Sequence, residues 1–213
     1  MSFDSAAEHR PDVDREAGAD PAAARRLADP KAMRALAHPV RLALLDQLAV
    51  HGTLTAARAA ELVGESAANC SFHLRTLAKY GFVEPAPGGP GSGRQRPWRR
   101  VPGGVGTTEV RDDSAESAAA QALTDVIVER RLDAIREYRA KVQPALPAEW
   151  QELSGHMNVI THLTLEESRQ LRDTLLGLLT AYADRETDPA TRPADAVPVQ
   201  LFAYLMPEGT ESS

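Results

Sequence analysis

The first clear hydrophobic pattern lies between Asp29 and Gly52, where apolar residues recur at helical spacing. Asp29 is a suitable N-cap and Pro30 suits the first helical position, so the pattern predicts a short helix from there. Pro39 disfavours helical backbone at the residue before it and therefore separates this helix from a second one. The second helix begins at Pro39 and ends at Gly52. Its broad apolar face consists of Val40, Leu42, Leu44, Leu45 and Leu48.

Two further helices are predicted before Tyr80. Thr55 can cap a helix over 56–63, and Ser66 can cap a fourth helix that runs to about Tyr80. At 100° per residue the fourth helix has two faces. One face carries Cys70, Leu74 and Leu77, with His73 at its edge, and is expected to be buried. The other carries Ala68, Ser71, Phe72, Arg75 and Lys79, and a helix that exposes such residues is suited to the major groove of DNA.

A two-stranded wing is predicted after the fourth helix. Gly81 closes that helix, and Phe82 with Val83 begins a strand. Residues 85–93 are a Pro, Gly and Ser loop, and residues 94–101 form the return strand. That strand carries Arg94, Arg96, Arg99 and Arg100. Wings of this kind contact the DNA backbone or the minor groove, where Arg is the preferred side chain.

A long helix is predicted over residues 115–143, ending before Pro144. Its wide apolar face includes Leu123, Ile127, Ile135 and Tyr138. A helix of this length on a small domain must bury that face, and a second copy of the chain is the simplest partner. These four residues are therefore the predicted dimerisation contacts.

The last third of the chain predicts strand, helix and strand. Residues 157–163 are rich in β-branched and apolar types, and residues 197–206 alternate sufficiently for a final strand. Between them, Thr164 and Glu167 have the spacing of a capping box for a helix from Leu165 to about Asp184.

The predicted fold class is mainly α with a small β component. It comprises a disordered tail (1–22), a winged helix-turn-helix domain (23–105), a long dimerisation helix (115–143), a C-terminal α/β segment (144–206) with a strand–helix–strand pattern, and a second disordered tail (207–213).

Charge is unevenly distributed in this acidic chain of net charge −6. Residues 31–101 hold ten Lys and Arg against four Asp and Glu, a net charge of +6. The segments before and after them carry net charges of −3 and −9. The basic part thus coincides with the helix-turn-helix pattern, and a local basic surface is what phosphate contact requires.

Composition favours a cytoplasmic protein. The N-terminus lacks the basic start and apolar core of a signal peptide, and no apolar run is long enough to span a membrane. The single cysteine, Cys70, cannot form an internal disulfide, which agrees with a reducing compartment. No membrane association and no cofactor are expected.

Three stretches together resemble the winged helix-turn-helix regulators of the ArsR type. They are the A-L-A-H-P-x-R-L-x-L-L run at 35–45, the S-x-x-x-x-S-x-H-L-R-x-L helix at 66–77, and Gly81 with the two residues that follow. The resemblance covers roughly residues 30–101, to which this chain adds a C-terminal α/β segment. It implies a homodimer that binds a palindromic operator in double-stranded DNA and usually represses transcription.

The chain departs from this family where many members bind a metal. The third helix has Arg58, Ala59, Ala60 and Glu61 where a metal site needs a Cys-x-Cys pair, and no His lies between His73 and His156. Metal sites of this kind need about three to four such ligands. His156 and His162 would lie about 20 Å apart on a strand, too far to share an ion. No metal site is therefore predicted.

The predicted DNA contacts lie on the fourth helix and the wing. Arg75 is the candidate for a bidentate guanine contact, and Phe72 for contact with a thymine methyl. Asn69 and Ser71 could bond bases or phosphates, and Ser66 begins a helix whose terminal amides could bind a phosphate. The remaining candidates are Lys79, Arg94, Arg96 and Arg99. Cys70 and His73 are interpreted as packed residues rather than as a sensor.

The leading hypothesis is a sequence-specific transcriptional regulator and homodimeric repressor, not an enzyme. One alternative is a protein-interaction module that keeps the winged-helix fold without reading DNA, suggested by the acidic C-terminal third. Another is an enzyme housed in the C-terminal segment, although the chain has no nucleophile–base or paired-carboxylate motif. An unidentified small-molecule effector could bind between the long helix and the C-terminal segment, but no particular residue indicates one.

Overall fold

The computed structural model describes residues 25–26, 29–87, 96–101, 105–106, 112 and 114–207. The predicted tail at 1–22, most of the wing loop, Arg94 and residues 208–213 lie outside them. In chain order the elements are β1 (Arg25–Arg26), α1 (Pro30–Leu36), α2 (Pro39–His51), β2 (Thr53–Leu54), α3 (Ala56–Val63), α4 (Ala67–Lys79), β3 (Val83–Pro85), β4 (Trp98–Arg100), β5 (Val105–Gly106), α5 (Ala115–Glu137), a π-helical turn (Tyr138–Val142), a 3-10 turn (Gln143–Ala145), α6 (Ala148–Leu153), α7 (Leu165–Thr180), α8 (Asp184–Thr187) and a final 3-10 turn (Pro189–Thr191).

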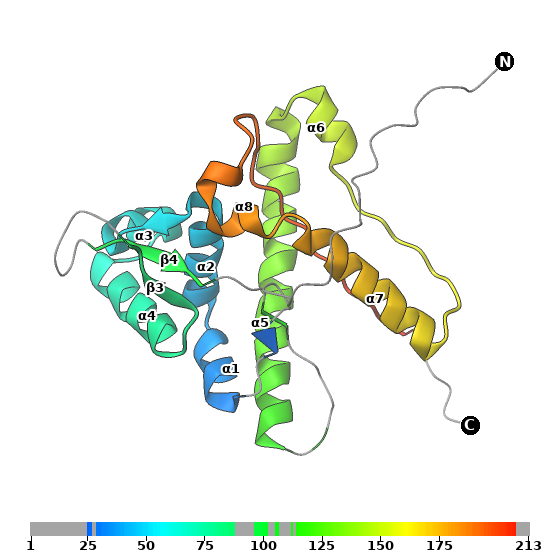
Figure 1. The fold of residues 1–213 in the computed structure, drawn as a ribbon, viewed down its shortest axis with the longest axis horizontal. Helices are drawn as coiled ribbons and strands as arrows, with labels where there is room; N and C mark the ends of the chain where they lie inside the picture. The colour runs from blue at the N-terminus through cyan, green and yellow to red at the C-terminus, as the bar shows by residue number, and fades with distance from the viewer. Residues whose placement is uncertain are drawn as a thin grey trace.

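The protein is mainly helical with a small sheet, as the sequence predicts. Figure 1 shows α1 to α4 and the sheet on one side of the long α5, and α7 on the other side. None of the helices within the described residues is long and apolar enough to cross a membrane.

The four predicted N-terminal caps are confirmed. The side chains of Asp29, Thr55 and Ser66 accept hydrogen bonds from backbone N–H groups in the first turns of α1, α3 and α4. Thr164 and Glu167 form the reciprocal bonds of a capping box at α7. Such caps satisfy N–H groups that have no partner inside the helix, so the local sequence alone determines where these helices begin.

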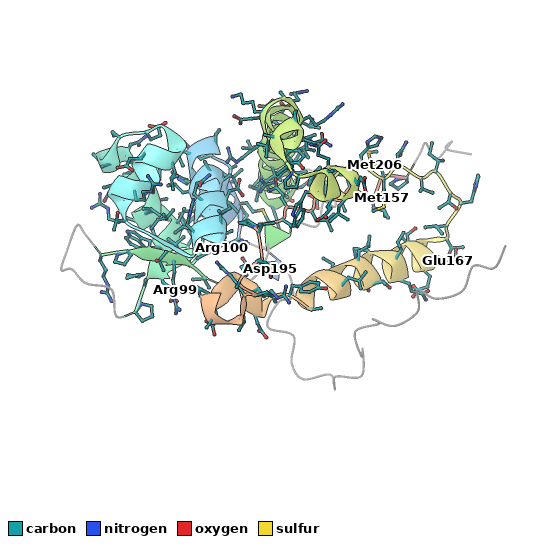
Figure 2. The ribbon with its side chains drawn as sticks, turned by 90° about the horizontal axis from the view of Figure 1, so that it is seen from above. Arg99, Arg100, Met157, Glu167, Asp195 and Met206 are labelled. Atoms are coloured by element: carbon teal, nitrogen blue, oxygen red, sulfur yellow. The ribbon has the colours of Figure 1, made fainter. Side chains whose placement is uncertain are left out.

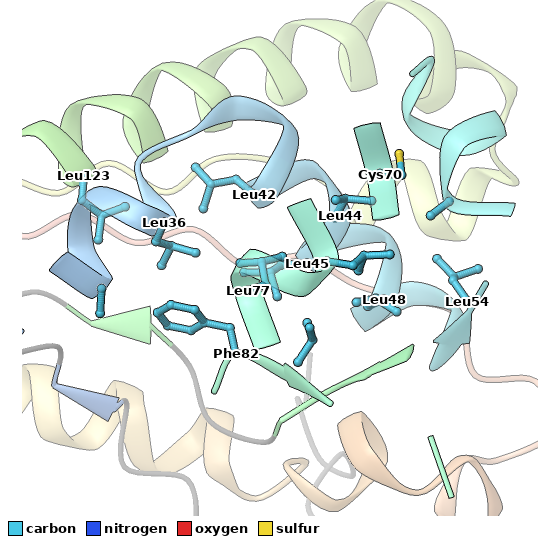
Figure 3. Close-up of a cluster of buried hydrophobic side chains, with 14 of the residues drawn as sticks. Leu36, Leu42, Leu44, Leu45, Leu48, Leu54, Cys70, Leu77, Phe82 and Leu123 are labelled. Atoms are coloured by element: carbon cyan, nitrogen blue, oxygen red, sulfur yellow. The ribbon is translucent and has the colours of Figure 1, made fainter. Parts of the chain in front are cut away.

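The core lies where α1 to α4 meet the sheet. Figure 3 shows leucines of α1 and α2 packed against Leu77 of α4 and Phe82, with Leu123 of α5 at one end. The fully buried large side chains are Met33, Leu36, Leu44, Leu48, Cys70, Leu74, Leu77, Val83 and Leu123. The apolar faces predicted for the second and fourth helices are therefore the faces that form this core.

The wing belongs to a three-stranded antiparallel sheet with the order β2–β4–β3. Thr53 and Leu54 form the third strand, which the two-stranded prediction lacks. Two residues give too little pattern for a strand to be recognised in sequence, and β2 exists because it pairs with Arg99 and Trp98 of β4. A separate parallel pair joins β1 and β5.

The first half of α5 belongs to the core of its own domain. Ala119, Ala120 and Leu123 are buried, and Ile127 packs against the same cluster. Asp46 of α2 reinforces the contact by accepting hydrogen bonds from Arg130 Nε at 2.9 Å and Arg131 Nη2 at 2.8 Å. Leu123, which the sequence predicts as a dimer contact, has an exposed fraction of 0% in its own protomer, because α5 covers the domain before it projects beyond it.

The two strands predicted in the C-terminal third do not form in the structure. Residues 157–163 and 197–206 form neither a strand nor a bridge, and the predicted helix ends at Thr180 rather than near Asp184. Their composition favours extended backbone, but a strand also needs a hydrogen-bonded neighbour. Neither segment makes a backbone hydrogen bond to another described part of the chain.

Candidate nucleic-acid interface

The fourth helix of the domain, α4, separates its two faces as predicted. Cys70, His73, Leu74 and Leu77 are buried against the core. The opposite face exposes Phe72, Arg75 and Lys79 to solvent. The preceding Gly64 ends α3 in the left-handed conformation with φ of +72°, so the chain reverses sharply between α3 and α4. This is a helix-turn-helix with the second helix presented outwards.

Three residues on the outer face are available to a ligand. The Arg75 guanidinium makes no hydrogen bond or ion pair with any described residue. Phe72 is 54% exposed, so its ring is accessible on this face. The Lys79 ammonium lies 5.7 Å from the Tyr80 ring centroid and is otherwise exposed. The outer face thus offers an unpaired fork of donors, an apolar ring and a cation.

Other predicted contacts on α4 are already occupied within the chain. Ser66 Oγ accepts the backbone N–H of Asn69 at 3.1 Å, and Asn69 Nδ2 donates to Glu65 Oε2 at 2.8 Å. Asn69 and Ser71 are both half-buried. Contact between the Asn69 amide and a base would therefore require it to leave Glu65.

The arginines of the wing differ from one another in a way that their sequence does not indicate. Arg96 is exposed, whereas Arg99 on β4 forms an ion pair with Glu84 of β3 at 2.6 Å. Arg100 forms an ion pair with Glu186 of α8, also at 2.6 Å. Figure 2 shows Arg99 and Arg100 on β4, beside α8. Arg96 is therefore the wing cation best placed to contact a phosphate within the described residues.

A cluster of two histidines and an arginine lies behind α4, and sequence reasoning did not find it. The rings of His38 and His73 lie 4.6 Å apart between centroids. Arg41 Nε donates to His73 Nδ1 at 3.2 Å, and the same guanidinium donates to the Ala35 carbonyl. His38 Nδ1 accepts the Val40 N–H as the N-cap of α2. In the sequence, Pro39 predicts only a helix break after His38, and His is not among the preferred N-cap residues, so no local signal indicates this cluster.

The surroundings of both imidazoles lower their pKa values and so favour the neutral form. Burial, followed by the positive charge of Arg41, lowers the pKa of His38 below its usual value. Burial, then His38 and Arg41, lowers the pKa of His73, which is only 5% exposed. The opposing effect of the Glu65 carboxylate is smaller. Each Nδ1 accepts a hydrogen bond, and protonation would remove that acceptor.

We predict that stability falls as the pH is lowered from 7.5 to 5.5. The folded-state pKa values of His38 and His73 lie below the unfolded value of about 6.5. Their contribution is therefore complete above about pH 6.5 and is lost as the pH falls towards the folded values, because the unfolded chain binds more protons. Urea unfolding at fixed protein concentration and several pH values measures this slope.

The matched variants are His38→Asn with His73→Gln, which keep an acceptor at each position but do not titrate. Their free energy of unfolding should depend much less on pH across the same range. His51→Gln, at an exposed position at the end of α2, is the control and should retain the wild-type slope. An unchanged slope in the double variant would show that other groups cause the acid sensitivity.

The surroundings of Cys70 do not favour a reactive thiol, and the structure shows no candidate metal site among the described residues. Cys70 is fully buried, and burial raises the pKa of its thiol, which disfavours the reactive thiolate. In the described part of the chain, no three His, Cys, Asp or Glu side chains gather closely enough to hold a metal ion.

Comparison with known proteins agrees with this geometry. Residues 36–86, from the end of α1 to just after β3, match the model of a family described as a helix-turn-helix domain. No curated protein is significantly similar to the chain. The match covers the elements that position α4, and it identifies a domain of the kind that DNA-binding regulators use.

Proposed function

We propose that the protein is a sequence-specific transcriptional regulator that binds a palindromic operator as a homodimer and represses transcription. The outer face of α4 carries this proposal, because Phe72, Arg75 and Lys79 are exposed while the opposite face is fixed in the core. A rigid helix with an unpaired Arg fork is suited to direct reading of bases in the major groove. The net charge of +6 on residues 31–101 supports the same conclusion.

Each residue has a distinct role in the proposed complex. Arg75 donates both arms of its guanidinium to O6 and N7 of a guanine, and Phe72 contacts a thymine methyl. Lys79 and Arg96 bind phosphates and thereby fix the position of the helix without selecting a sequence. Two copies would place their α4 helices about one turn of DNA, roughly 34 Å, or a multiple of it apart.

Only the second half of α5 has apolar surface left for contact with a second copy. Beyond Ile127 the apolar side chains of α5 are exposed or half-buried, and Ile135 is among the exposed ones. Tyr138 donates its hydroxyl to Ser154 Oγ at 2.7 Å and so joins the end of the helix to α6. Of the four dimerisation residues predicted, Ile135 retains the most surface for a partner.

We expect binding to an operator selected from the source genome to weaken by about 10³-fold between 50 and 200 mM salt, if a dimer makes about six phosphate contacts. Each contact with Lys or Arg releases counterions, so the logarithm of the affinity falls linearly with the logarithm of the salt concentration. Fluorescence anisotropy across a salt series measures the slope.

Two variants calibrate this slope. Lys79→Ala should reduce its magnitude by about one contact per protomer without changing which sequences bind. Lys141→Ala removes an exposed cation that pairs with Glu137 far from α4, and it should leave the slope unchanged. Equal effects of the two substitutions would place the DNA elsewhere on the protein.

The exposed apolar side chains of the acidic C-terminal third favour a second candidate, a protein-interaction module without sequence-specific DNA binding. That third exposes large hydrophobic side chains, as protein-binding surfaces do. If no DNA fragment bound selectively in a selection from a library of source-genome fragments, and the protein formed a stable complex with a different protein, this candidate would be favoured over the regulator.

A further inference from the structure

After Leu123, none of the side chains whose burial the structure describes is buried. Of 23 exposed large hydrophobic residues in the described part, 18 lie between residues 153 and 206. We call these the C-terminal apolar surface: Leu153, Met157, Val159, Ile160, Leu163, Leu165, Leu171, Leu175, Leu176, Leu178, Tyr182, Val197, Val199, Leu201, Phe202, Tyr204, Leu205 and Met206.

We propose that the C-terminal apolar surface is a dimer interface, on which the same surface of a second copy docks. This rests on the homodimer of the proposed function and deepens it, because it assigns the contact to residues 153–206 in addition to α5. Segments 157–163 and 197–206, which have strand composition but form no strand in the protomer, would obtain their strand partners in that contact.

The amount of exposed surface is sufficient for a stable dimer. Met157 is 95% exposed, and the whole set presents on the order of 2,000 Å², against about 800 Å² that each partner contributes to a standard interface. Large apolar side chains exposed in this number are typical of a region that a partner covers. Along α7, Leu171, Leu175 and Leu178 follow the i, i+4, i+7 spacing of a face that packs against a neighbour.

The charge pattern favours a second copy as the occupant. Residues 157–163 and 197–206 contain no Asp, Glu, Lys or Arg, although residues 102–213 carry a net charge of −9. Two copies can therefore bring these segments together without repulsion between like charges, whereas other parts of the same third would repel. Identical extended segments can also pair antiparallel across a two-fold axis, which satisfies the backbone groups of both.

The position of the surface leaves DNA binding free. Figures 1 and 2 place α7, with Met157 and Met206, across α5 from the wing arginines Arg99 and Arg100. The exposed Ile135 of α5 lies in the projecting half of that helix, which leads into α6 and the start of the surface. A dimer built here would hold two winged domains on the outside, each with its α4 uncovered.

Sedimentation equilibrium of the full chain in the absence of DNA tests the proposal. The wild type should be a dimer at micromolar concentration. The double variant Val159→Asp with Leu201→Asp should weaken self-association at least 100-fold, because both positions are exposed and apolar. The matched control, Asn158→Asp with Gln200→Glu, adds the same charge at adjacent positions and should remain dimeric.

Two outcomes would overturn the inference. A wild type that stays monomeric at 100 µM would mean that another partner or the chain itself covers the surface, and a double variant as dimeric as the wild type would confine the interface to α5. Circular dichroism should confirm unchanged helix content. The oligomeric state is measured without DNA. A wild-type protein that dimerises but binds no operator would therefore refute the proposed function and leave this inference standing.

Discussion

Replacing Leu123 by Ala should lower the free energy of unfolding by about 2–5 kcal/mol, the usual cost of deleting a buried leucine side chain. Leu123 has no exposed surface and lies at the end of the core, where α5 meets the first helix of the domain. The substitution removes apolar contacts and leaves a cavity that the surrounding helices fill only in part. Urea unfolding at fixed protein concentration measures the loss.

Val50→Ala is the matched control, since Val50 is an exposed apolar residue of α2 in the same domain. Its effect should stay within about 0.5 kcal/mol. The contrast also separates two roles for the long helix. If Leu123→Ala changed the dimer dissociation constant but cost less than about 1 kcal/mol of protomer stability, Leu123 would be a contact between chains and the core assignment would fail.

Leu123 illustrates why the sequence predicts where the helices lie along the chain better than it predicts what each helix packs against. Apolar spacing and caps locate α1 to α4 almost to the residue, because they depend on neighbours along the chain. The same spacing in α5 cannot distinguish a face buried in its own domain from one buried in another chain. That distinction depends on where the helix lies in space.

The C-terminal segments show that strand composition alone does not produce a strand. Residues 157–163 and 197–206 have strand composition, yet they have no strand partner in the described chain. β2, in contrast, is only two residues long and is a strand because β4 lies beside it. Strand formation is decided by the neighbour that supplies hydrogen bonds, and local sequence does not encode that neighbour.

The sequence predicts which residues lie on the candidate interface, but it does not predict which of them are already paired within the chain. Helical spacing places Phe72, Arg75 and Lys79 on one face, and the structure exposes all three. Which wing arginines are already paired depends on Glu84 and Glu186, which lie 15 and 86 residues away in the sequence from Arg99 and Arg100 respectively. Distant pairs of this kind need the folded structure.

Arg75→Ala should weaken operator binding by about 1–3 kcal/mol, which corresponds to roughly a 5- to 150-fold loss per protomer contact, and should relax the preference for one base pair. The guanidinium is unpaired within the described residues, so its removal breaks no bond that supports the fold. The unfolding free energy should therefore change little, and the loss would come from the interface.

Three comparisons make this result specific. Arg75→Lys keeps the charge but loses the two-armed geometry, so it should retain the wild-type salt slope yet lose discrimination at that base pair. Lys79→Ala should weaken all sequences alike, since a phosphate contact carries no base information. Arg136→Ala, on the exposed side of α5 where it pairs with Asp133, should change neither property. An Arg75→Ala variant with wild-type affinity and selectivity would remove α4 as the reading helix, because the direct contact that defines its role would be absent.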